Sequence, residues 1–341
     1  MADLGRLRRA HEQLREQIAQ IVVGQEEVVE QLMIAIFARG HCILEGVPGL
    51  AKTLMVSTLA SCLSLNFTRI QFTPDLMPSD ITGTEVLQED RQSGTRHLQF
   101  IRGPVFTNIL LADEINRTPP KTQAALLEAM QERQVSIGGK RHGLTDPFFV
   151  LATQNPIEQE GTYPLPEAQL DRFLFKVFVG YPTADDERQI YRRTTGSEVG
   201  HVSKVLDGAE IPHLQDIIRS VPISDSVLDY VMALVRATRP AEPTRPDYIS
   251  RWVSWGAGPR AGQAMILSAK ARAALHGRTS VGIDDIRAVA KPVLRHRLVA
   301  TYAAQADGQT PDTIVERLVQ DIPVRPGANE LDGRVAQVFR S

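Results

Sequence analysis

Residues 42–53 have the residue types and the spacing of a phosphate-binding loop. A short apolar run leads into a glycine-containing turn, and Lys52, Thr53 and an apolar helical pattern follow. Strand, turn and helix in this order are the context that such a loop requires. Because Gly46 and Gly49 permit backbone angles that are closed to other residues, successive N–H groups can converge on a phosphate. We therefore expect a nucleotide-binding site at this turn.

The two residues that open the following helix would supply the chemistry. Lys52 would reach the β- and γ-phosphates as a point charge, and the Thr53 hydroxyl would bind Mg²⁺. Ala51 departs from the usual G-x-x-x-x-G-K-[ST] pattern, because it stands where the second glycine is expected. Alanine fits there only if its φ angle is negative. The alternative interpretation is a glycine-rich turn that precedes a lysine by chance.

A second candidate group, Asp113 and Glu114, follows the apolar run of residues 108–112. Acids after a buried strand are costly unless they emerge at the carboxyl edge of a sheet, where ligands bind. Asp113 would hold Mg²⁺, directly or through water, and Glu114 would be the general base for the attacking water. The alternative is a solvated Glu114 in a turn. The phosphate-binding loop upstream favours catalysis, because the two motifs supply complementary halves of one reaction.

Three further residues are candidates. Asn155 follows a predicted strand at residues 148–153 and would orient the attacking water or contact the γ-phosphate; alternatively it turns the chain before Pro156. Arg172, at the end of a short helix, is interpreted as an arginine finger facing a neighbouring subunit's nucleotide, although such an arginine normally caps carbonyls or forms an ion pair. Arg260 follows a Gly-Pro turn and would reach the γ-phosphate of its own subunit, coupling nucleotide state to the domain angle.

These residues need a sheet that brings several strand ends together. Apolar and alternating runs predict strands at residues 41–45, 67–72, 108–112, 148–153 and 175–179. Helical patterns lie between them, so the fold class is α/β, with a mostly parallel sheet flanked by helices. Beyond Gly180 helical patterns dominate, which predicts a smaller all-α C-terminal domain.

The predicted domains follow from these patterns. The α/β core would cover residues 1–182, a linker residues 183–222 and the helical domain residues 223–341. Residues 74–101 are too long for a bare connection, so we expect an insertion with its own hairpin around Gly94. A second hairpin is predicted on either side of Gly138-Gly139.

Composition bounds the class of protein. The chain has 341 residues and a net charge of −2, so no global field draws it toward nucleic acid or an anionic membrane. Cys42 and Cys62 are too few for a disulfide framework and lie in apolar runs. No apolar run reaches the roughly 18 residues of a spanning helix, and the charged, helical N terminus differs from a signal peptide. We expect a cytoplasmic protein.

Several motifs together resemble the MoxR family of AAA+ ATPases. They are the loop at residues 46–53 with alanine before the lysine, the sequences LLADEINR, ATQNP, LDRF and GPRAGQ, and longer stretches at residues 69–83 and 116–136. The resemblance covers nearly the whole chain. It implies an AAA+ P-loop core with a helix-2 insert at about residues 74–101 and a pre-sensor-1 hairpin at about residues 134–147, followed by a helical lid domain.

The resemblance also implies individual roles, with ATP as the nucleotide and Mg²⁺ as the metal. The implied catalytic residues are Lys52 (Walker A), Asp113 and Glu114 (Walker B), Asn155 (sensor 1), Arg172 (finger) and Arg260 (sensor 2). Thr53 and Asp113 are the implied metal ligands. The implied nucleotide contacts are Val23, Gly24, Gln25, Gly46, Val47, Pro48, Gly49, Leu50, Ala51, Lys52, Thr53 and Leu54. Of these, the first three would line the adenine pocket.

Three functions remain in competition. By its resemblance, the chain would be an ATP-driven remodelling chaperone in hexameric rings, acting on a protein client. A partner with a von Willebrand A domain, in metal-cofactor insertion or complex maturation, is part of that hypothesis. The second hypothesis is a nucleic-acid-stimulated AAA+ motor, which the near-neutral charge disfavours. The third is a nucleotide-gated scaffold with little turnover, which would have no need for a water activator at Glu114.

Overall fold

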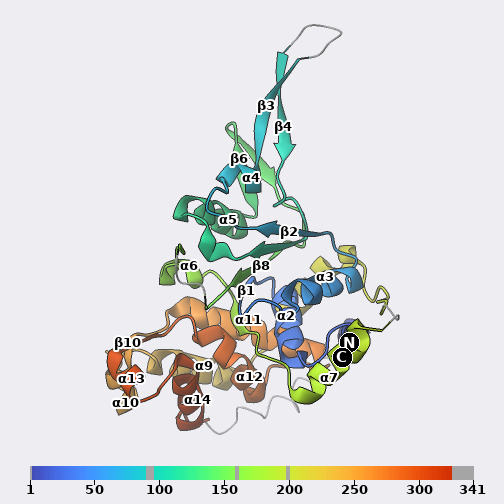
Figure 1. The fold of residues 1–341 in the computed structure, drawn as a ribbon. Coiled ribbons are helices and arrows are strands. Elements are labelled where there is room, and N and C mark those ends of the chain that lie inside the picture. Colours follow the sequence, from blue (N-terminus) through green and yellow to red (C-terminus); the bar gives the residue numbers. More distant parts are fainter. Residues whose placement is uncertain (1, 90–95, 158–160, 197–199, 325–341) are drawn as a thin grey trace.

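The computed structural model describes residues 2–89, 96–157, 161–196 and 200–324. Its centre is a five-stranded sheet in the order β2-β5-β8-β1-β9, in which every neighbouring pair is parallel (Figure 1). The strands are β1 (Cys42–Glu45), β2 (Phe67–Gln71), β5 (Ile109–Asp113), β8 (Phe149–Gln154) and β9 (Phe175–Phe178). The predicted α/β class and all five predicted strands are confirmed.

Helices cover both faces of this sheet. α2 (Glu26–Phe37) and α3 (Lys52–Cys62) pack on one face, and α5 (Pro120–Glu132) packs on the other. Successive strand side chains point to opposite faces. Leu111 therefore joins the cluster with α2 and α3, while Leu110 joins the cluster with α5. Burial on both faces explains why the central strands are continuous apolar runs in the sequence.

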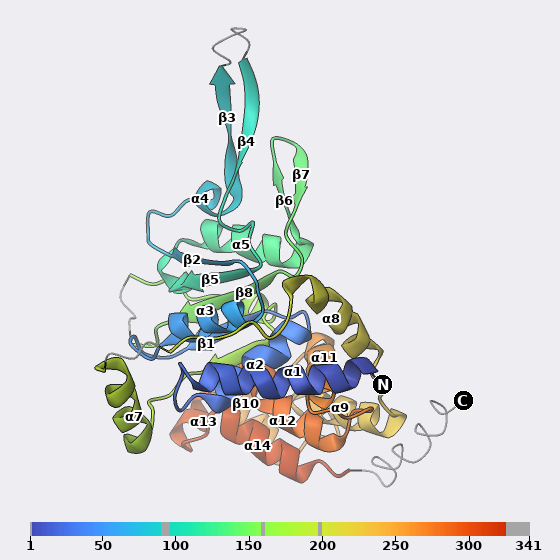
Figure 2. The same cartoon turned by 90° about the vertical axis from the view of Figure 1, so that its right-hand side faces the viewer.

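Two hairpins project from the core beyond α5 (Figures 1 and 2). The longer one, which we call the arm, follows α4 (Pro78–Thr82) and pairs β3 (Gly83–Glu89) with β4 (Arg96–Arg102). Its predicted turn around Gly94 lies outside the described residues. The shorter hairpin pairs β6 (Gln134–Ile137) with β7 (Lys140–Gly143). Both hairpins were expected from the sequence.

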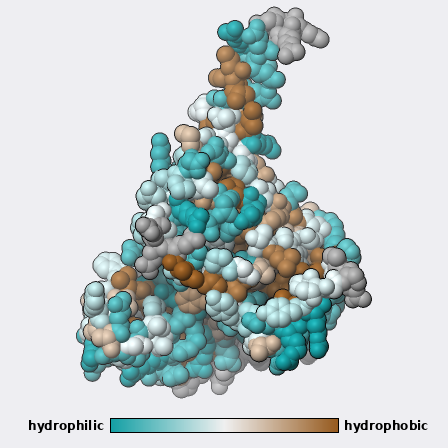
Figure 3. Space-filling model, viewed as in Figure 1, coloured by the Kyte–Doolittle hydropathy of each residue, from teal (hydrophilic) through white to brown (hydrophobic). Residues whose placement is uncertain are grey.

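The arm combines an exposed apolar surface with a closely packed base. Leu87 faces Leu98 across the ladder and both are 62% exposed, while Ile101 is 51% exposed. Figure 3 shows this apolar surface as brown spheres along the arm. At the base, Gly83 and Gly103 lie side by side, and a Cβ atom on either would collide with the opposing backbone. The arm therefore leaves the core through a narrow, tightly packed pair of strands.

The C-terminal described residues form a cluster of helices on the opposite side of the sheet from the arm (Figure 1). The helices are α9 (Asp225–Ala237), α10 (Asp247–Trp252), α11 (Pro259–Leu275), α12 (Ile283–Leu294), α13 (Tyr302–Ala306) and α14 (Pro311–Asp321). One feature departs from the predicted all-α character: β10 (Val253–Trp255) and β11 (Val299–Ala300) form an antiparallel ladder. Strands of two and three residues are too short to give a periodic sequence pattern.

The connections between core and lid also have structure. Residues 183–222, predicted as a linker, hold α7 (Ala184–Thr194), the 3₁₀ turn η2 (Gly208–Glu210) and α8 (Ile211–Ser220). α8 packs against α11 and α2, so this segment contributes to the hydrophobic core. The short α6 (Glu167–Leu170) is the helix expected before Arg172, and it ends two residues before that arginine, because the chain turns there toward β9. The domain boundaries stay a prediction.

The N-terminal helix α1 (Ala2–Ala19) lies across α2, α3, α8 and α11 (Figure 2). His11 Nε2 is 2.6 Å from Glu30 Oε2, and His276 Nε2 is 2.8 Å from Glu30 Oε1. Burial acts to raise the pKa of Glu30, but the hydrogen bonds and charges of His11 and His276 outweigh it and lower that pKa to about 2. This His–Glu–His cluster joins α1, core helix α2 and the end of lid helix α11.

Candidate active site

The turn after β1 has two glycines in different roles. Gly49 has φ +87°, and a Cβ atom there would meet nothing within 4 Å, so open space lies beside the loop. Gly46 packs against the residue that follows β9, because a Cβ atom there would lie 2.7 Å from the carbonyl oxygen of Val179. The loop is thus fixed on its inner side and open on its outer side.

Ala51 adopts φ +54°, in the left-handed region. The expectation of a negative angle at this position is therefore wrong. A non-glycine residue pays about 1–2 kcal/mol for this conformation. The surrounding loop imposes it, because α3 begins at the next residue and must point its N terminus across the open side of the turn.

The N terminus of α3 and the ammonium of Lys52 together form a site that attracts anions. Among the described residues, no side chain caps α3, so its first N–H groups lack intrahelical partners and lie at the positive end of the helix dipole. Lys52 Nζ donates to the carbonyl oxygen of Gly46 at 2.5 Å, which folds the ammonium back over the loop. Burial lowers the pKa of Lys52, and the charges of Asp113 and Glu114 act in the opposite sense.

Asp113 ends β5 and is held on both carboxylate oxygens. The hydroxyl of Thr153, on β8, donates to Oδ1 at 2.6 Å. Arg69, on β2, donates to Oδ2 from Nη2 at 2.6 Å and from Nε at 3.0 Å. These contacts follow from strand order, because β5 lies between β2 and β8. The carboxylate is thereby oriented before any metal binds.

Glu114 directly follows β5 in a left-handed conformation, with φ +58°. Its backbone N–H donates to the hydroxyl of Thr153 at 2.8 Å. Its carboxylate accepts from Gln71 Nε2 at 2.7 Å and lies 3.1 Å from Nε of Arg117, in the 3₁₀ turn η1 (Ile115–Arg117). Strained backbone at a polar cavity is typical of functional sites. Here it turns Glu114 away from the strand direction.

These groups line one cavity of about 450 Å³ at the carboxyl edge of the sheet. Its lining is Pro48, Gly49, Leu50, Ala51, Lys52, Thr53, Leu54, Arg69, Gln71, Asp113, Glu114 and Asn155. Asn155 is buried just beyond β8, and its side-chain oxygen accepts the N–H of Ile157 at 3.2 Å. The structure therefore brings together the predicted Walker A, Walker B and sensor 1 residues.

The cavity fits a magnesium–nucleotide complex. It offers an uncapped helix terminus and the ammonium of Lys52 for phosphate oxygens. It also offers the hydroxyl of Thr53 and the carboxylate of Asp113, which are the oxygen ligands that Mg²⁺ prefers. Open space beside Gly49 lets phosphate approach the backbone closely.

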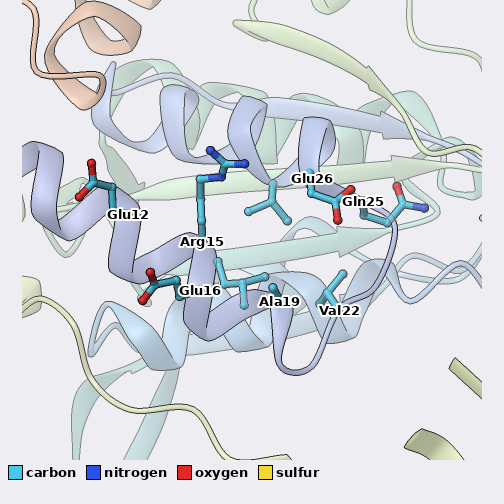
Figure 4. Close-up of a pocket in the computed structure, with 9 residues that line it drawn as sticks. Glu12, Arg15, Glu16, Ala19, Val22, Gln25 and Glu26 are labelled. Carbon is cyan, nitrogen blue, oxygen red and sulfur yellow. The ribbon is translucent and has the colours of Figure 1, made fainter. Parts of the chain in front are cut away.

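The predicted adenine residues Val23, Gly24 and Gln25 do not line this cavity. Gln25 lines a separate hollow of about 360 Å³ between α1 and the start of α2 (Figure 4). Its Nε2 donates to the carbonyl oxygen of Gly180 at 3.1 Å. Gly24 has φ +71° and packs against Asp186, because a Cβ atom there would lie 2.6 Å from that carboxylate. The adenine role of this turn stays a prediction.

The two predicted arginines also lie outside the cavity lining. Arg172 is half-buried just after α6 and forms no ion pair with any residue that the structure describes. Arg260 opens α11, and its Nη1 lies 3.5 Å from Oδ2 of Asp171. Both arginines are therefore close to each other in the fold, at the junction of core and lid, rather than beside Lys52.

Sequence reasoning missed three residues of this site: Arg69, Gln71 and Thr153. Arg69 and Gln71 alternate with apolar residues along β2, which indicated only a half-exposed strand. Arg69 and Gln71 are two residues apart and so point to the same face of β2, and Gln71 is in register with Asp113 across the parallel pair. This shared face was the signal that could have placed both side chains beside Asp113. Thr153 is buried at the end of an apolar strand, where its hydroxyl requires a partner.

Comparisons with known proteins agree with this fold and site. The model of the ATPase family associated with various cellular activities (AAA) matches residues 41–175, and the AAA lid domain model matches residues 248–318. The fold and site thus define an AAA+ ATPase. Chaperone MoxR1 of Mycobacterium tuberculosis is 46% identical, over 90% of this chain and 80% of the relative. This chain belongs to the MoxR family of AAA+ ATPases.

Two further comparisons extend this result. Protein MoxR of Methylorubrum extorquens is 33% identical, over 87% of this chain and 90% of the relative. A solved crystal structure of a protein from Cytophaga hutchinsonii is 41% identical, with a TM-score of 0.87 over 95% of this chain and 97% of that chain. Within the part of the chain that the structure describes, every helix is too short or too polar to cross a membrane.

Proposed function

We propose that this chain hydrolyses ATP to ADP and phosphate, with Mg²⁺ as its metal. The observation that carries the proposal is the convergence of Lys52, Asp113 and Glu114 on one cavity. Lys52 and the N–H groups of residues 48–54 would bind the phosphates, and Thr53 and Asp113 would hold the metal. When bound, Mg²⁺ would neutralise charge on the phosphate oxygens.

Glu114 is the proposed general base for the attacking water, with Asn155 orienting that water or contacting the γ-phosphate. The carboxylate of Glu114 is 20% exposed and bonded to Gln71 and Arg117. These two contacts hold the carboxylate in place at the edge of the cavity.

We further propose hexameric rings, in which Arg172 of one subunit reaches the nucleotide of the next. The position of Arg172 supports this, because it lies outside its own subunit's cavity and has no ion pair among the described residues. Arg260 would act as sensor 2 within its own subunit. Its position at the start of α11 lets a movement of the lid change its distance from the cavity.

At the level of the whole protein, we propose an ATP-driven chaperone that remodels or matures protein complexes. The relative named Chaperone MoxR1 supports this class. The exposed Leu87, Leu98 and Ile101 of the arm fit contact with a protein client. A partner with a von Willebrand A domain, a role in metal-cofactor insertion and a cytoplasmic location complete the proposal.

The alternative is a motor whose hydrolysis nucleic acid stimulates. The shorter hairpin is basic in sequence, but His142 stacks on Phe100 of the arm with ring centroids 4.1 Å apart. Just before β6, Nη1 of Arg133 lies 3.7 Å from Oδ1 of Asp146. Two of the side chains that make this region basic are thus engaged within the fold, which favours the chaperone.

Phosphate release and ATP binding by the purified chain test the proposal. Glu114→Gln should bind ATP like the wild type and hydrolyse it at least about 100-fold more slowly, as expected for loss of a general base. Lys52→Ala should lose ATP affinity, and Lys204→Ala, an exposed lysine paired with Asp207, is the matched control. Unchanged ATP binding by Lys52→Ala, or rapid turnover by Glu114→Gln, contradicts the proposal. Stimulation by DNA or RNA that falls steeply with salt favours the motor instead.

A further inference from the structure

The segment that carries the proposed finger is held by the lid. The segment of residues 171–176 comprises the connection from α6 to β9 and the first two residues of β9, and three consecutive residues after α12 bond to it. These three are Arg295, His296 and Arg297. They contact the carbonyl oxygens of Asp171, Phe173, Leu174 and Lys176, with hydrogen bonds of 3.1, 2.8, 3.3 and 3.1 Å from the two arginines. His296 adds a contact of 3.1 Å to Phe173.

Arg297 is the centre of this contact. Its side chain is only 3% exposed, so each of its donors needs a partner inside the fold. Besides three carbonyls of the segment, it bonds to the carbonyl of Val293 and, through Nε, to Oδ1 of Asp171 at 2.7 Å. A guanidinium has a rigid fork of five donors, so this arrangement fixes direction as well as distance. Residues 171–174 and the end of α12 must therefore move together.

Asp171 is shared by two arginines of the lid. Its Oδ1 accepts from Arg297, and its Oδ2 lies 3.5 Å from Nη1 of Arg260. The distance of 3.5 Å is long for a hydrogen bond, and the side chain of Arg260 is half exposed. The ion pair between Arg260 and Asp171 is therefore weak. Arg172, the next residue in the chain, has no such contact among the described residues. Asp171 thus directly precedes the proposed finger, Arg172, and its carboxylate contacts the proposed nucleotide sensor, Arg260.

We infer that Asp171 and Arg297 are positioning residues for Arg172, and that the lid of one subunit orients the finger offered to its neighbour. This rests on the proposed ATPase with its finger acting in trans. If Arg260 turns to its own subunit's γ-phosphate, Asp171 keeps only Arg297, and the finger segment follows the lid. The nucleotide state of one subunit is then transmitted to the hydrolysis site of the next.

Mixed rings test this inference, using Asp171→Asn and Arg297→Lys. Alone, each variant should bind ATP within about twofold of wild type and hydrolyse it up to about 100-fold more slowly, the effect of a small misplacement of a catalytic group. Mixed with Glu114→Gln, which supplies intact fingers, Asp171→Asn should regain hydrolysis. Mixed with Arg172→Ala it should not, because every finger is then defective. Arg297→Lys keeps the charge but loses the fork, so its defect should be milder.

Asp307→Asn is the matched control, because Asp307 accepts from Arg251 at 2.8 Å and from Trp252 at 2.7 Å within the lid. It should lower the melting temperature as much as Asp171→Asn while hydrolysis stays near wild type. Full hydrolysis by Asp171→Asn overturns the inference, and so does failure of Glu114→Gln to restore it, which would place the defect in the variant's own cavity. If Glu114→Gln does not restore even Arg172→Ala, the proposed trans finger fails first.

Discussion

The cavity around Lys52 and the segment around Arg172 are positioned in different ways. The cavity is built on β1, β2, β5 and β8, four neighbouring strands of one sheet. The segment of residues 171–176 runs into the edge strand β9 and is held by side chains of the lid. The lining of the cavity lies within the core, whereas the position of the segment around Arg172 depends on how core and lid pack.

This difference separates two kinds of catalytic group. Groups on adjacent strand ends keep their spacing as long as the sheet is folded, so they suit phosphate and metal binding. Groups held by the lid change position when the lid moves, so they suit communication between subunits. Substitutions in each region can therefore test that separation.

Replacing Arg172 with alanine should separate the two regions most clearly. Hydrolysis should fall by about 10³-fold or more, the typical contribution of an arginine finger, while ATP affinity stays within about twofold. Fluorescent-nucleotide titration and phosphate release measure the two quantities. Arg192→Ala, on the exposed surface of α7, is the control. A comparable loss of ATP affinity would show that Arg172 belongs to the cavity of its own subunit.

Glu30→Gln should weaken the attachment of the lid at a second place. The pKa of Glu30, about 2, lies below its ordinary value of 4.5, so its charged form favours the folded state. That contribution, about 3 kcal/mol, is full above pH 4.5 and is lost as the pH falls toward 2. Urea unfolding should show this pH dependence in the wild type and a flatter one in the variant.

The control for that measurement is Glu12→Gln. Glu12 lies on α1 and pairs with Arg8 at 2.9 Å, but both side chains are more than half exposed. Exposed pairs contribute at most about 1 kcal/mol, so this variant should keep the pH dependence of the wild type. Equal pH dependence in all three proteins would argue against the His–Glu–His cluster as a source of stability.

Ala51→Gly should have the smallest effect. Glycine adopts φ +54° without steric strain, so the free energy of unfolding should rise by up to about 1 kcal/mol, offset in part by the greater freedom of the unfolded chain. ATP affinity should change by less than about threefold, because Lys52 remains at the N terminus of α3. Ser64→Gly, at the other end of α3 with φ +50°, is the control for strain alone. A large loss of ATP affinity would show that Ala51 itself shapes the cavity.

The sequence was informative wherever a residue's place depends on its own strand. The apolar runs before Lys52, Asp113 and Asn155 predicted buried parallel strands, and the carboxyl ends of such strands meet at one edge. Ala51 was misjudged because the backbone angle is imposed by the loop and not by the side chain. Arg69 was missed because its partner on β5 is set by strand order, which local periodicity does not reveal.

The lid contacts were beyond sequence reasoning for a different reason. Arg297 bonds to a segment more than 120 positions earlier, and nothing in the local pattern of α12 indicates such a partner. The β10–β11 ladder is likewise formed by residues distant in sequence. Long-range packing of short segments decides both, whereas propensity and period report only on neighbours in the chain.

The arm also has a mechanical consequence. Its ladder of seven residue pairs extends for about 20 Å at the usual rise per residue. A rotation of roughly 15° at its base, the size of known rigid-body rotations, would sweep the far pair, Glu89 and Arg96, through about 5 Å. Because the Gly83–Gly103 contact leaves no free space at the base of the arm, a small rotation of the core would displace the far end of the arm by this larger distance.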